Sequence, residues 1–318
     1  MADARAIGRP TGKCRMRRSV ERMDDYFDIS RKIVANMTSE SWRSIPHVSV
    51  LLEADVGLLL MLLNDYNQEH EEKISLNSAM VKLIAEGLRA NPKLNGHVHY
   101  NRWLVSGKTR LLEHVDVSMP ILYDGKMITV TLPHAERLSM LEIQNRVKAI
   151  RERIGHTDMP ATLYKTGLLD TFEGLRKGKI VTAAGRLLGA KFGKGRVRVA
   201  AHTSDSADSI HPEEIRQGSV TISNMGSLYS EWKGSISILE IVPPQICAFG
   251  IGSLQKRPVV NKDNEIASAD ILPITIAFDH RALDFEPVAA FMKDLNEFFR
   301  NEERIQSWMG NRQDKLPQ

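Results

Sequence analysis

Apolar residues recur with two different periods along the chain, and these periods predict both helices and strands. Between positions 75 and 90 an apolar residue recurs every three or four positions, at Leu76, Met80, Leu83, Ile84 and Leu88. This spacing predicts a helix, and Asn91-Pro92 should end it, because the residue before proline is disfavoured in the helical region. The same reasoning predicts further helices at 26–43, 56–72 and 137–154, and strands at 45–53, 97–105 and 126–132.

One predicted strand leads straight into candidate chemistry. Residues 274–278, with the sequence ITIAF, are apolar or β-branched and are followed by Asp279, His280 and Arg281. A second carboxylate, Asp284, stands four positions after the histidine. A neutral imidazole titrates near neutral pH, so a histidine at the end of a buried strand can act as a base on a substrate thiol or hydroxyl. His-x-x-x-Asp alone is a weak signal, since many chains contain it by chance.

Composition sets the class of protein. With 318 residues, 42% hydrophobic and 26% charged, the chain is typical of a globular protein of one large or two small domains. A net charge of +4 is too small to indicate nucleic acid as a partner. Cys14 and Cys247 lie far apart, and Cys247 is expected in the core, so neither a disulfide nor a zinc site is predicted. With no secretory signal or long apolar run visible, the expected compartment is the cytoplasm.

Two basic stretches depart from the globular pattern. Residues 1–20 are rich in Arg and Lys, which favours a solvated mobile arm over a binding arm. Between 174 and 200 the charged residues are all basic: Arg176, Lys177, Lys179, Arg186, Lys191, Lys194, Arg196 and Arg198. Apolar residues are interleaved among them. This stretch either leaves a solvated basic face or docks an acidic carrier protein or an anionic membrane surface.

Several ordered segments resemble one enzyme family. Before the His280 strand stand GSVTISNMGS (218–227), IVPPQICAFGIG (241–252) and RPVV (257–260). Further upstream stand SRKIVANM (30–37), SIPHVSVLLEADV (44–56), SLNSAMVKLIAEGLRANPKLNG (75–96) and RLSMLEI (137–143). Together they resemble the catalytic domain of the dihydrolipoamide acyltransferases of 2-oxo acid dehydrogenase complexes and, more distantly, chloramphenicol acetyltransferase. The resemblance covers most of residues 26–155 and 216–300.

The resemblance implies a fold and a site. The fold would be α/β (α+β) of the chloramphenicol-acetyltransferase type, a mixed sheet covered by helices, in a homotrimer whose active sites lie between subunits. His280 would be the general base, and Ser223 would donate to the oxyanion of the tetrahedral intermediate. Asp284 would support the site through an ion pair with Arg31. The remaining supporting residues are Asn224, next to Ser223, and Phe285, next to Asp284.

Other histidines carry no predicted chemistry. His47 is expected to be structural or to lie near the substrate channel. His97, His99, His114 and His134 show no metal-ligand spacing that fits a fold element, so they are interpreted as surface or core residues and no metal is predicted.

The sequence also departs from the family pattern. Phe285 stands where the family has glycine, and its ring could reshape the acceptor channel or tilt Asp284. A single acyltransferase domain is expected at 21–318, with a basic insertion at about 156–215. The chain shows no lipoyl domain or peripheral-subunit-binding domain, so no covalent lipoyl group is expected on it.

The sequence therefore predicts a stand-alone acyltransferase that moves an acyl group between a coenzyme A or carrier thioester and an acceptor thiol or hydroxyl. One alternative is a core subunit of a 2-oxo acid dehydrogenase complex that acts on a lipoyl domain of another chain. Another is an inactive trimeric scaffold. Expected partners are further copies of the chain, acyl-CoA, and an acidic carrier, a lipoyl domain or an anionic membrane surface bound through 174–200.

Overall fold

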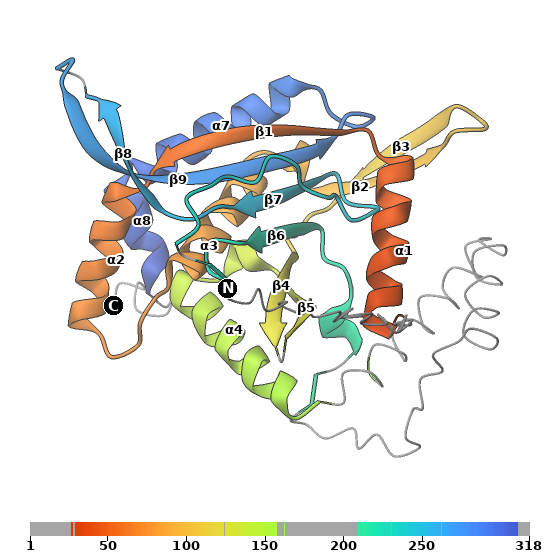
Figure 1. Cartoon of the computed structure of the whole chain (residues 1–318), viewed down its shortest axis with the longest axis horizontal. Helices are drawn as coiled ribbons and strands as arrows, with labels where there is room; N and C mark the ends of the chain where they lie inside the picture. Colours follow the sequence, from red (N-terminus) through yellow and green to blue (C-terminus); the bar gives the residue numbers. More distant parts are fainter. Residues whose placement is uncertain are drawn as a thin grey trace, which may run out of the picture.

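The computed structural model describes residue 27, residues 29–157 apart from 124, residue 162, and residues 209–310 apart from 211, 230 and 262. A seven-stranded mixed sheet runs through this part of the chain, with helices around it (Figure 1). The predicted arm 1–20 and most of the predicted insertion 156–215 lie outside the described residues.

The sheet joins strands that are far apart in the sequence. Its strands are β1 (His47–Asp55), β4 (Val117–Tyr123), β5 (Lys126–Leu132), β6 (Val220–Asn224), β7 (Cys247–Ile251), β8 (Gln255–Val260) and β9 (Ile266–Asp279). Their order is β1-β9-β7-β6-β4-β5, and β8 pairs with the first part of β9. Strands β4, β6 and β7 are parallel to one another, and the other pairs are antiparallel.

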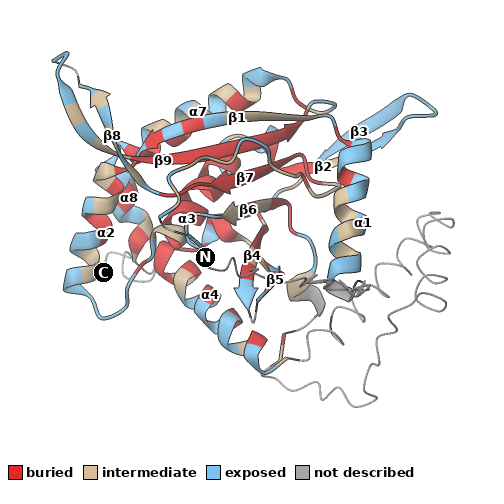
Figure 2. Ribbon diagram, in the orientation of Figure 1, coloured by how far each residue is buried: buried red, intermediate tan, exposed pale blue. Residues whose placement is uncertain are grey.

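Strand β9 is the longest strand and pairs with three others, β1, β7 and β8. Its first residues are partly exposed, but every residue from Ile271 to Asp279 is buried, because β1 and β7 flank it there (Figure 2). The predicted strand 274–278 is thus confirmed as the buried part of a longer strand. Cys247 on β7 is also fully buried, as predicted, and burial raises the pKa of its thiol.

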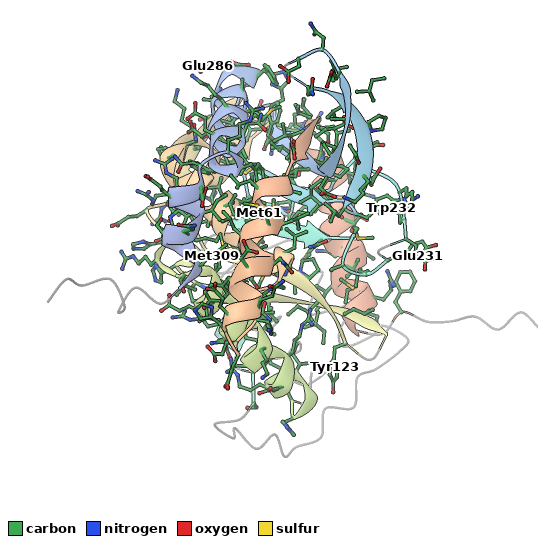
Figure 3. The ribbon with its side chains drawn as sticks, turned by 90° about the vertical axis from the view of Figure 1, so that its left-hand side faces the viewer. Met61, Tyr123, Glu231, Trp232, Glu286 and Met309 are labelled. Carbon is green, nitrogen blue, oxygen red and sulfur yellow. The ribbon has the colours of Figure 1, made fainter. Side chains whose placement is uncertain are left out.

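Six α-helices surround the sheet within the described ranges. They are α1 (Ile29–Ser44), α2 (Gly57–Glu69), α3 (Leu76–Ala90), α4 (Met140–Gly155), α7 (Phe285–Phe299) and α8 (Glu302–Met309). Short 3-10 turns are η1 (Pro92–Leu94), η2 (Ala135–Arg137) and η3 (Pro212–Ile215). Helix α3 packs against α4 and α7, and α2 packs against α8. On α2, Met61 points outward with 51% of its surface exposed, whereas Leu62 is buried (Figure 3).

Local signals set the ends of the predicted helices. Ser75 caps α3 by accepting a hydrogen bond from the Ser78 N–H, and α3 is buried at every position from Ser78 to Leu88. Ser139 and Glu142 form a capping box at the start of α4. Both predicted helices, 75–90 and 137–154, are confirmed. No helix in the described ranges has the length and apolar character needed to cross a bilayer.

The predicted strand 97–105 is wrong in its second half. The strand β2 (Gly96–Asn101) ends at Asn101, and the chain turns back as β3 (Ser106–Leu111). The turn contains Val105 with a φ of 46°, and Asn101 Oδ1 accepts the N–H groups of Trp103 and Leu104. This side-chain hydrogen bonding ends the strand, although the apolar turn residues suggest its continuation.

Candidate active site

His280 follows directly after the end of strand β9, beside the start of β1 (Figure 1). Its backbone N–H donates to the Pro46 carbonyl at 3.1 Å. The N–H of Asp279 donates to the Ile246 carbonyl at 2.8 Å. These bonds reach the segments on both sides of β9, so they fix the backbone that carries the imidazole.

The His280 imidazole has a defined hydrogen-bond pattern. Its Nδ1 lies 2.9 Å from the carbonyl oxygen of Leu283. Because a carbonyl oxygen can only accept, Nδ1 carries the proton in the neutral ring and Nε2 keeps its lone pair. The side chain is 52% exposed, so Nε2 can meet a substrate. The geometry fits a general base.

A buried ion pair spans the histidine. Arg281 Nη2 lies 2.6 Å from Asp279 Oδ2, and Arg281 Nε lies 3.0 Å from Oδ1. The Asp279 carboxylate is fully buried, and the Arg281 guanidinium also lies 5.6 Å from the centre of the Tyr100 ring. The sequence analysis named Asp279 and Arg281 but did not predict that they form an ion pair. Their opposite charges, two positions apart, could have indicated it.

Asp284 stands at the N-cap of α7 and is largely exposed. Its side chain is 92% exposed, and Oδ1 lies 3.9 Å from His280 Nδ1. At this distance the carboxylate acts on the imidazole only as a nearby charge in water. Asp284 thus lies beside His280, and its carboxylate faces solvent in the single protomer.

The predicted ion pair between Asp284 and Arg31 is absent from the part of the chain that the structure describes. Arg31 is exposed near the first turn of α1. Helix α1 ends at Ser44, next to the start of β1, and Arg31 stands 13 residues before that end. Thirteen helical residues span about 20 Å, so Arg31 lies about that far from the start of β1. Arg31 and Asp284 are therefore far apart within one protomer, and the predicted pair does not form there.

Ser223 lies on β6, away from His280 of the same chain. It pairs with Gly250 of β7, which pairs with Thr275 of β9. His280 follows Thr275 by five residues, so Ser223 and His280 are about 16 Å apart along the strand direction. Across the sheet they are two strand spacings, or about 9.6 Å, apart. Within one protomer the two side chains cannot contact the same substrate carbonyl.

The neighbours of Ser223 hold the end of β6. Asn224 Nδ2 donates to Asn77 Oδ1 of α3 at 2.9 Å, and Asn224 Oδ1 accepts the N–H of Ser227 at 2.9 Å. Asn224 therefore supports the turn that follows Ser223. The Ser223 hydroxyl itself makes no hydrogen bond within the described residues, so it is available to a ligand.

His47 and Phe285 have clear positions as well. His47 Nδ1 lies 2.9 Å from the Ile45 carbonyl, and Nε2 accepts the N–H of Ile241 at 3.1 Å. Both nitrogens are thus engaged with backbone, and His47 is structural. Phe285 begins α7 directly after Asp284 and is 54% exposed. Its ring is open to a ligand or to another chain.

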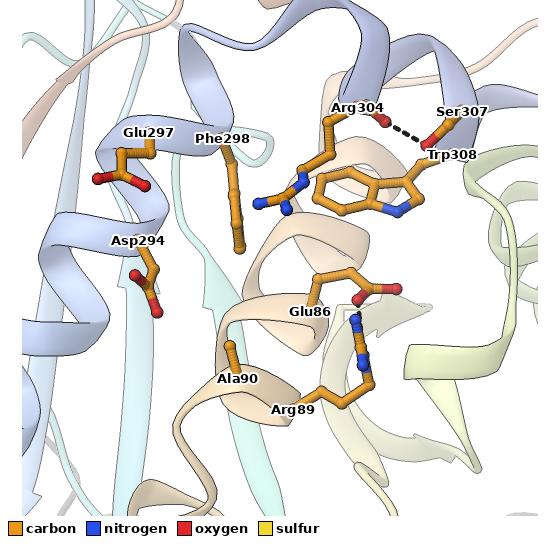
Figure 4. Close-up of a pocket in the computed structure, with 9 residues that line it drawn as sticks. All are labelled: Glu86, Arg89, Ala90, Asp294, Glu297, Phe298, Arg304, Ser307 and Trp308. Carbon is orange, nitrogen blue, oxygen red and sulfur yellow. Dashed lines mark hydrogen bonds and ion pairs between the residues drawn. The ribbon is translucent and has the colours of Figure 1, made fainter.

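A pocket of about 440 Å³ lies elsewhere, between α3, α7 and α8 (Figure 4). Its lining is Glu86, Arg89, Ala90, Asp294, Glu297, Phe298, Arg304, Ser307 and Trp308. The Arg304 guanidinium lies 5.0 Å from the Phe298 ring. Asp294 is ten residues along α7 from Asp284, or about 15 Å, so this pocket is separate from His280.

The chain matches the family model described as 2-oxoacid dehydrogenases acyltransferase (catalytic domain) over residues 22–162 and 198–306. It is 24% identical over 275 residues to the dihydrolipoyllysine-residue acetyltransferase component of the pyruvate dehydrogenase complex of Rickettsia conorii, covering 85% of this chain and 52% of that protein. The corresponding component from Zymomonas mobilis is 25% identical over 265 residues, covering 82% and 46%. The chain therefore spans about half the length of these curated relatives.

Two solved structures have the same fold. A probable dihydrolipoamide acetyltransferase from Listeria monocytogenes matches with a TM-score of 0.61 and 18% identity, over 88% of this chain and 94% of that one. Dihydrolipoamide acetyltransferase from Azotobacter vinelandii, studied for the role of a serine, a histidine and an asparagine in its catalytic mechanism, matches with a TM-score of 0.63 and 15% identity, over 94% and 99%. The predicted fold class, a mixed sheet covered by helices, is confirmed.

Proposed function

Because the chain belongs to the family of 2-oxoacid dehydrogenase acyltransferase catalytic domains, we propose that it is the acyltransferase core of a 2-oxo acid dehydrogenase complex. In this role it moves an acyl group between coenzyme A and the thiol of a dihydrolipoyl group. The two curated relatives are components of pyruvate dehydrogenase complexes. This favours the core-subunit alternative over the stand-alone acyltransferase predicted from the sequence.

The observation that carries the proposal is the hydrogen bond from His280 Nδ1 to the Leu283 carbonyl at 2.9 Å. It leaves the lone pair of Nε2 exposed at the end of β9. A thiol is a weak nucleophile until a base takes its proton, and this nitrogen is suited to that step.

The reaction follows from these groups. His280 Nε2 takes the proton of the acceptor thiol, and the thiolate attacks the thioester carbonyl carbon. The Ser223 hydroxyl donates to the oxyanion of the tetrahedral intermediate, which has more negative charge than the ground-state carbonyl. When the intermediate collapses, the carbon–sulfur bond to the leaving thiol breaks and that sulfur takes the proton from the imidazolium.

The site needs a second copy of the chain. Ser223 and His280 of one protomer are too far apart to act together, because of the strand register that separates them. A homotrimer in which His280 of one subunit faces Ser223 of the next would bring both groups to one substrate. One solved structure with this fold is the cubic core of a pyruvate dehydrogenase multienzyme complex.

The spacing of the proposed site also agrees with a relative. The Azotobacter histidine and asparagine stand four positions apart, as His280 and Asp284 do here. The serine of that protein precedes its histidine by 52 positions, and Ser223 precedes His280 by 57. Asp284 takes the place of an asparagine, which supports a role in positioning rather than in proton transfer.

Coenzyme A release tests the activity. The full chain is incubated with acetyl-CoA and dihydrolipoamide, and free coenzyme A is measured over time. Removal of a positioned general base lowers the turnover rate at least about 100-fold, so we expect the kcat of His280→Ala to fall by this factor. His70→Ala is the matched control, because His70 is exposed at the end of α2 and should leave kcat unchanged. A parent chain that forms trimers but never releases coenzyme A would support the inactive scaffold instead.

The acceptor side is tested through Phe285. By the resemblance described above, Phe285 stands where the family has glycine, and its side chain is exposed next to Asp284 in the sequence. If it narrows the acceptor channel, Phe285→Gly should lower the KM for dihydrolipoamide and leave the KM for acetyl-CoA unchanged. An equal change in both values would place the ring outside the acceptor channel.

A further inference from the structure

Two histidines and a glutamate meet at the open end of the β4–β5 hairpin. Strand β4 begins at Val117, which pairs with Leu132 at the end of β5. His114 precedes this pair, whereas His134 and Glu136 follow it. One ligand atom from each of the three residues lies within 4.8 Å of the others. The hairpin register thus gathers groups that the sequence separates by about twenty positions.

The Glu136 carboxylate is held in place from several directions. Its side chain is 6% exposed, and Oε2 accepts the N–H of Val115 at 3.0 Å. The backbone carbonyl of Glu136 accepts a hydrogen bond from buried Lys82 Nζ at 2.8 Å. The other carboxylate oxygen, Oε1, lies 3.2 Å from His114 Nδ1. One oxygen is therefore fixed by backbone while the second faces the imidazoles.

The two imidazoles contact each other edge to face, with ring centres 4.3 Å apart and planes at 73°. His134 Nδ1 is buried and has no hydrogen-bond partner among the described residues. A buried ring nitrogen without a partner destabilises the fold, because it no longer forms a hydrogen bond with water and forms none with the protein. A bound cation would satisfy such a nitrogen.

The backbone at His134 is fixed in an uncommon conformation. Its φ is 53° and its ψ is 42°, the left-handed region that non-glycine residues rarely adopt. The His134 N–H donates to Asp116 Oδ1 at 2.9 Å, and the Ala135 N–H donates to the Val115 carbonyl at 2.9 Å. These bonds fix the backbone that carries the His134 imidazole.

We propose that His114, His134 and Glu136 bind a divalent transition-metal ion, with Zn²⁺ the best match. Zinc takes imidazole nitrogen and carboxylate oxygen at about 2.0–2.2 Å in a tetrahedral arrangement, which places neighbouring ligand atoms about 3.3–3.5 Å apart. The His114–Glu136 separation of 3.2 Å is already close to that value. Imidazole ligands select zinc-like ions over Mg²⁺ and Ca²⁺, and three protein ligands leave one position for water.

The surrounding charges allow a cation to enter. Arg137 lies nearest, with Nε 3.5 Å from Glu136 Oε1 and Nη2 3.4 Å from His114 Nδ1. Without metal, its guanidinium partly neutralises the Glu136 carboxylate. Its side chain is 60% exposed and can turn out into water. Glu113 and Asp116 add negative charge at the loop, which favours a divalent ion over the arginine.

Metal titration of the untagged full chain tests this site. Zn²⁺ binding is followed by calorimetry and Co²⁺ binding by visible absorption, after EDTA treatment and dialysis. We expect one ion per chain. We also expect His134→Asn and Glu136→Gln to bind Zn²⁺ at least about tenfold more weakly, since replacing even a residue that only hydrogen-bonds to a metal ligand weakens metal binding by that factor. Asparagine tolerates the left-handed backbone, and glutamine can still accept the Val115 N–H, so both variants should keep their melting temperature in EDTA.

The matched control is His156→Ala, which removes an exposed histidine outside the cluster and should bind like the parent. Zn²⁺ should also raise the melting temperature of the parent and of His156→Ala, but not that of His134→Asn. Equal binding by the parent, His134→Asn and Glu136→Gln would show that other histidines bind the ion and would overturn the proposal. So would a parent chain that binds neither Zn²⁺ nor Co²⁺.

Discussion

Asp279 and Arg281 form a two-point ion pair across His280, with Arg281 Nη2 2.6 Å from Asp279 Oδ2 and Nε 3.0 Å from Oδ1. The backbone N–H of Arg281 also donates to Asp279 Oδ1 at 2.9 Å. The fully buried carboxylate therefore closes a tight turn around the histidine. This turn, together with the Leu283 carbonyl, sets where the imidazole points.

Removal of Arg281 should destabilise the protein and slow acyl transfer. In Arg281→Ala the Asp279 carboxylate stays buried without its cation, which should lower the free energy of unfolding by about 3 kcal/mol. Urea unfolding and coenzyme A release measure the two effects. Arg300→Ala, at an exposed position after α7, is the control and should change neither. An Arg281→Ala protein with parental stability would show that the pair is not structural.

Mixed trimers should restore activity if the site lies between subunits. His280→Ala and Ser223→Ala chains are each expected to be nearly inactive. When they are unfolded together, mixed in equal amounts and refolded, about a quarter of the interfaces should pair an intact His280 with an intact Ser223. Activity near that fraction of a parent chain refolded in the same way would place the site between subunits. A mixture no more active than its two components would argue against it.

Glu240 should make stability depend on pH. Burial raises the pKa of its carboxyl, and the hydrogen bond from Thr38 Oγ1 at 3.1 Å and the nearby His47 oppose that rise only in part. An acid with a higher pKa in the folded state binds more protons when folded. The free energy of unfolding therefore falls as pH rises from 4.5, the ordinary value, through the raised pKa.

Glu240→Gln should remove the fall in the free energy of unfolding at higher pH, because glutamine does not ionise. We expect the variant to gain stability over the parent at about pH 8 and to lose that gain at about pH 4, where the parental carboxyl is protonated in both states. Thermal unfolding at the two pH values measures the difference. Glu231→Gln, at an exposed carboxyl, is the matched control and should show no such dependence. A Glu240→Gln protein that follows the parent at both pH values would contradict the prediction.

The basic stretch 174–200 either forms a solvated basic face or docks an anionic partner, and a variant with fewer charges distinguishes the two. If the stretch docks a partner, replacing Arg176, Lys177, Lys179 and Arg186 by Gln should leave turnover on free dihydrolipoamide intact. Turnover on a purified acidic lipoyl domain should fall, and in the parent it should weaken as salt rises, because exposed charges are screened beyond about 8 Å at physiological ionic strength. Equal turnover of parent and variant on both acceptors would favour the solvated basic face. Loss of trimer assembly in the variant would instead assign the stretch to the catalytic core.

Short-range patterns were enough to predict much of the fold. The apolar repeat between Leu76 and Leu88 and the break at Asn91-Pro92 give helix α3, because helix periodicity and the restriction before proline act within a few residues. The buried run 274–278 gives the end of β9 and places His280 at its terminus in the same way. These features depend on neighbours in the sequence, so the sequence by itself determined them.

The tertiary structure decided what depends on contacts between distant segments. Lys82 lies on a helix that the sequence predicts, yet its side chain is only 1% exposed, because Glu86 and the Glu136 carbonyl bind its ammonium group. The register of β6, β7 and β9 separates Ser223 from His280, and no local pattern encodes that register. The hairpin β4–β5 brings His114 to His134 in the same manner. Strand pairing and packing are long-range choices, so they appear only once the whole chain is folded.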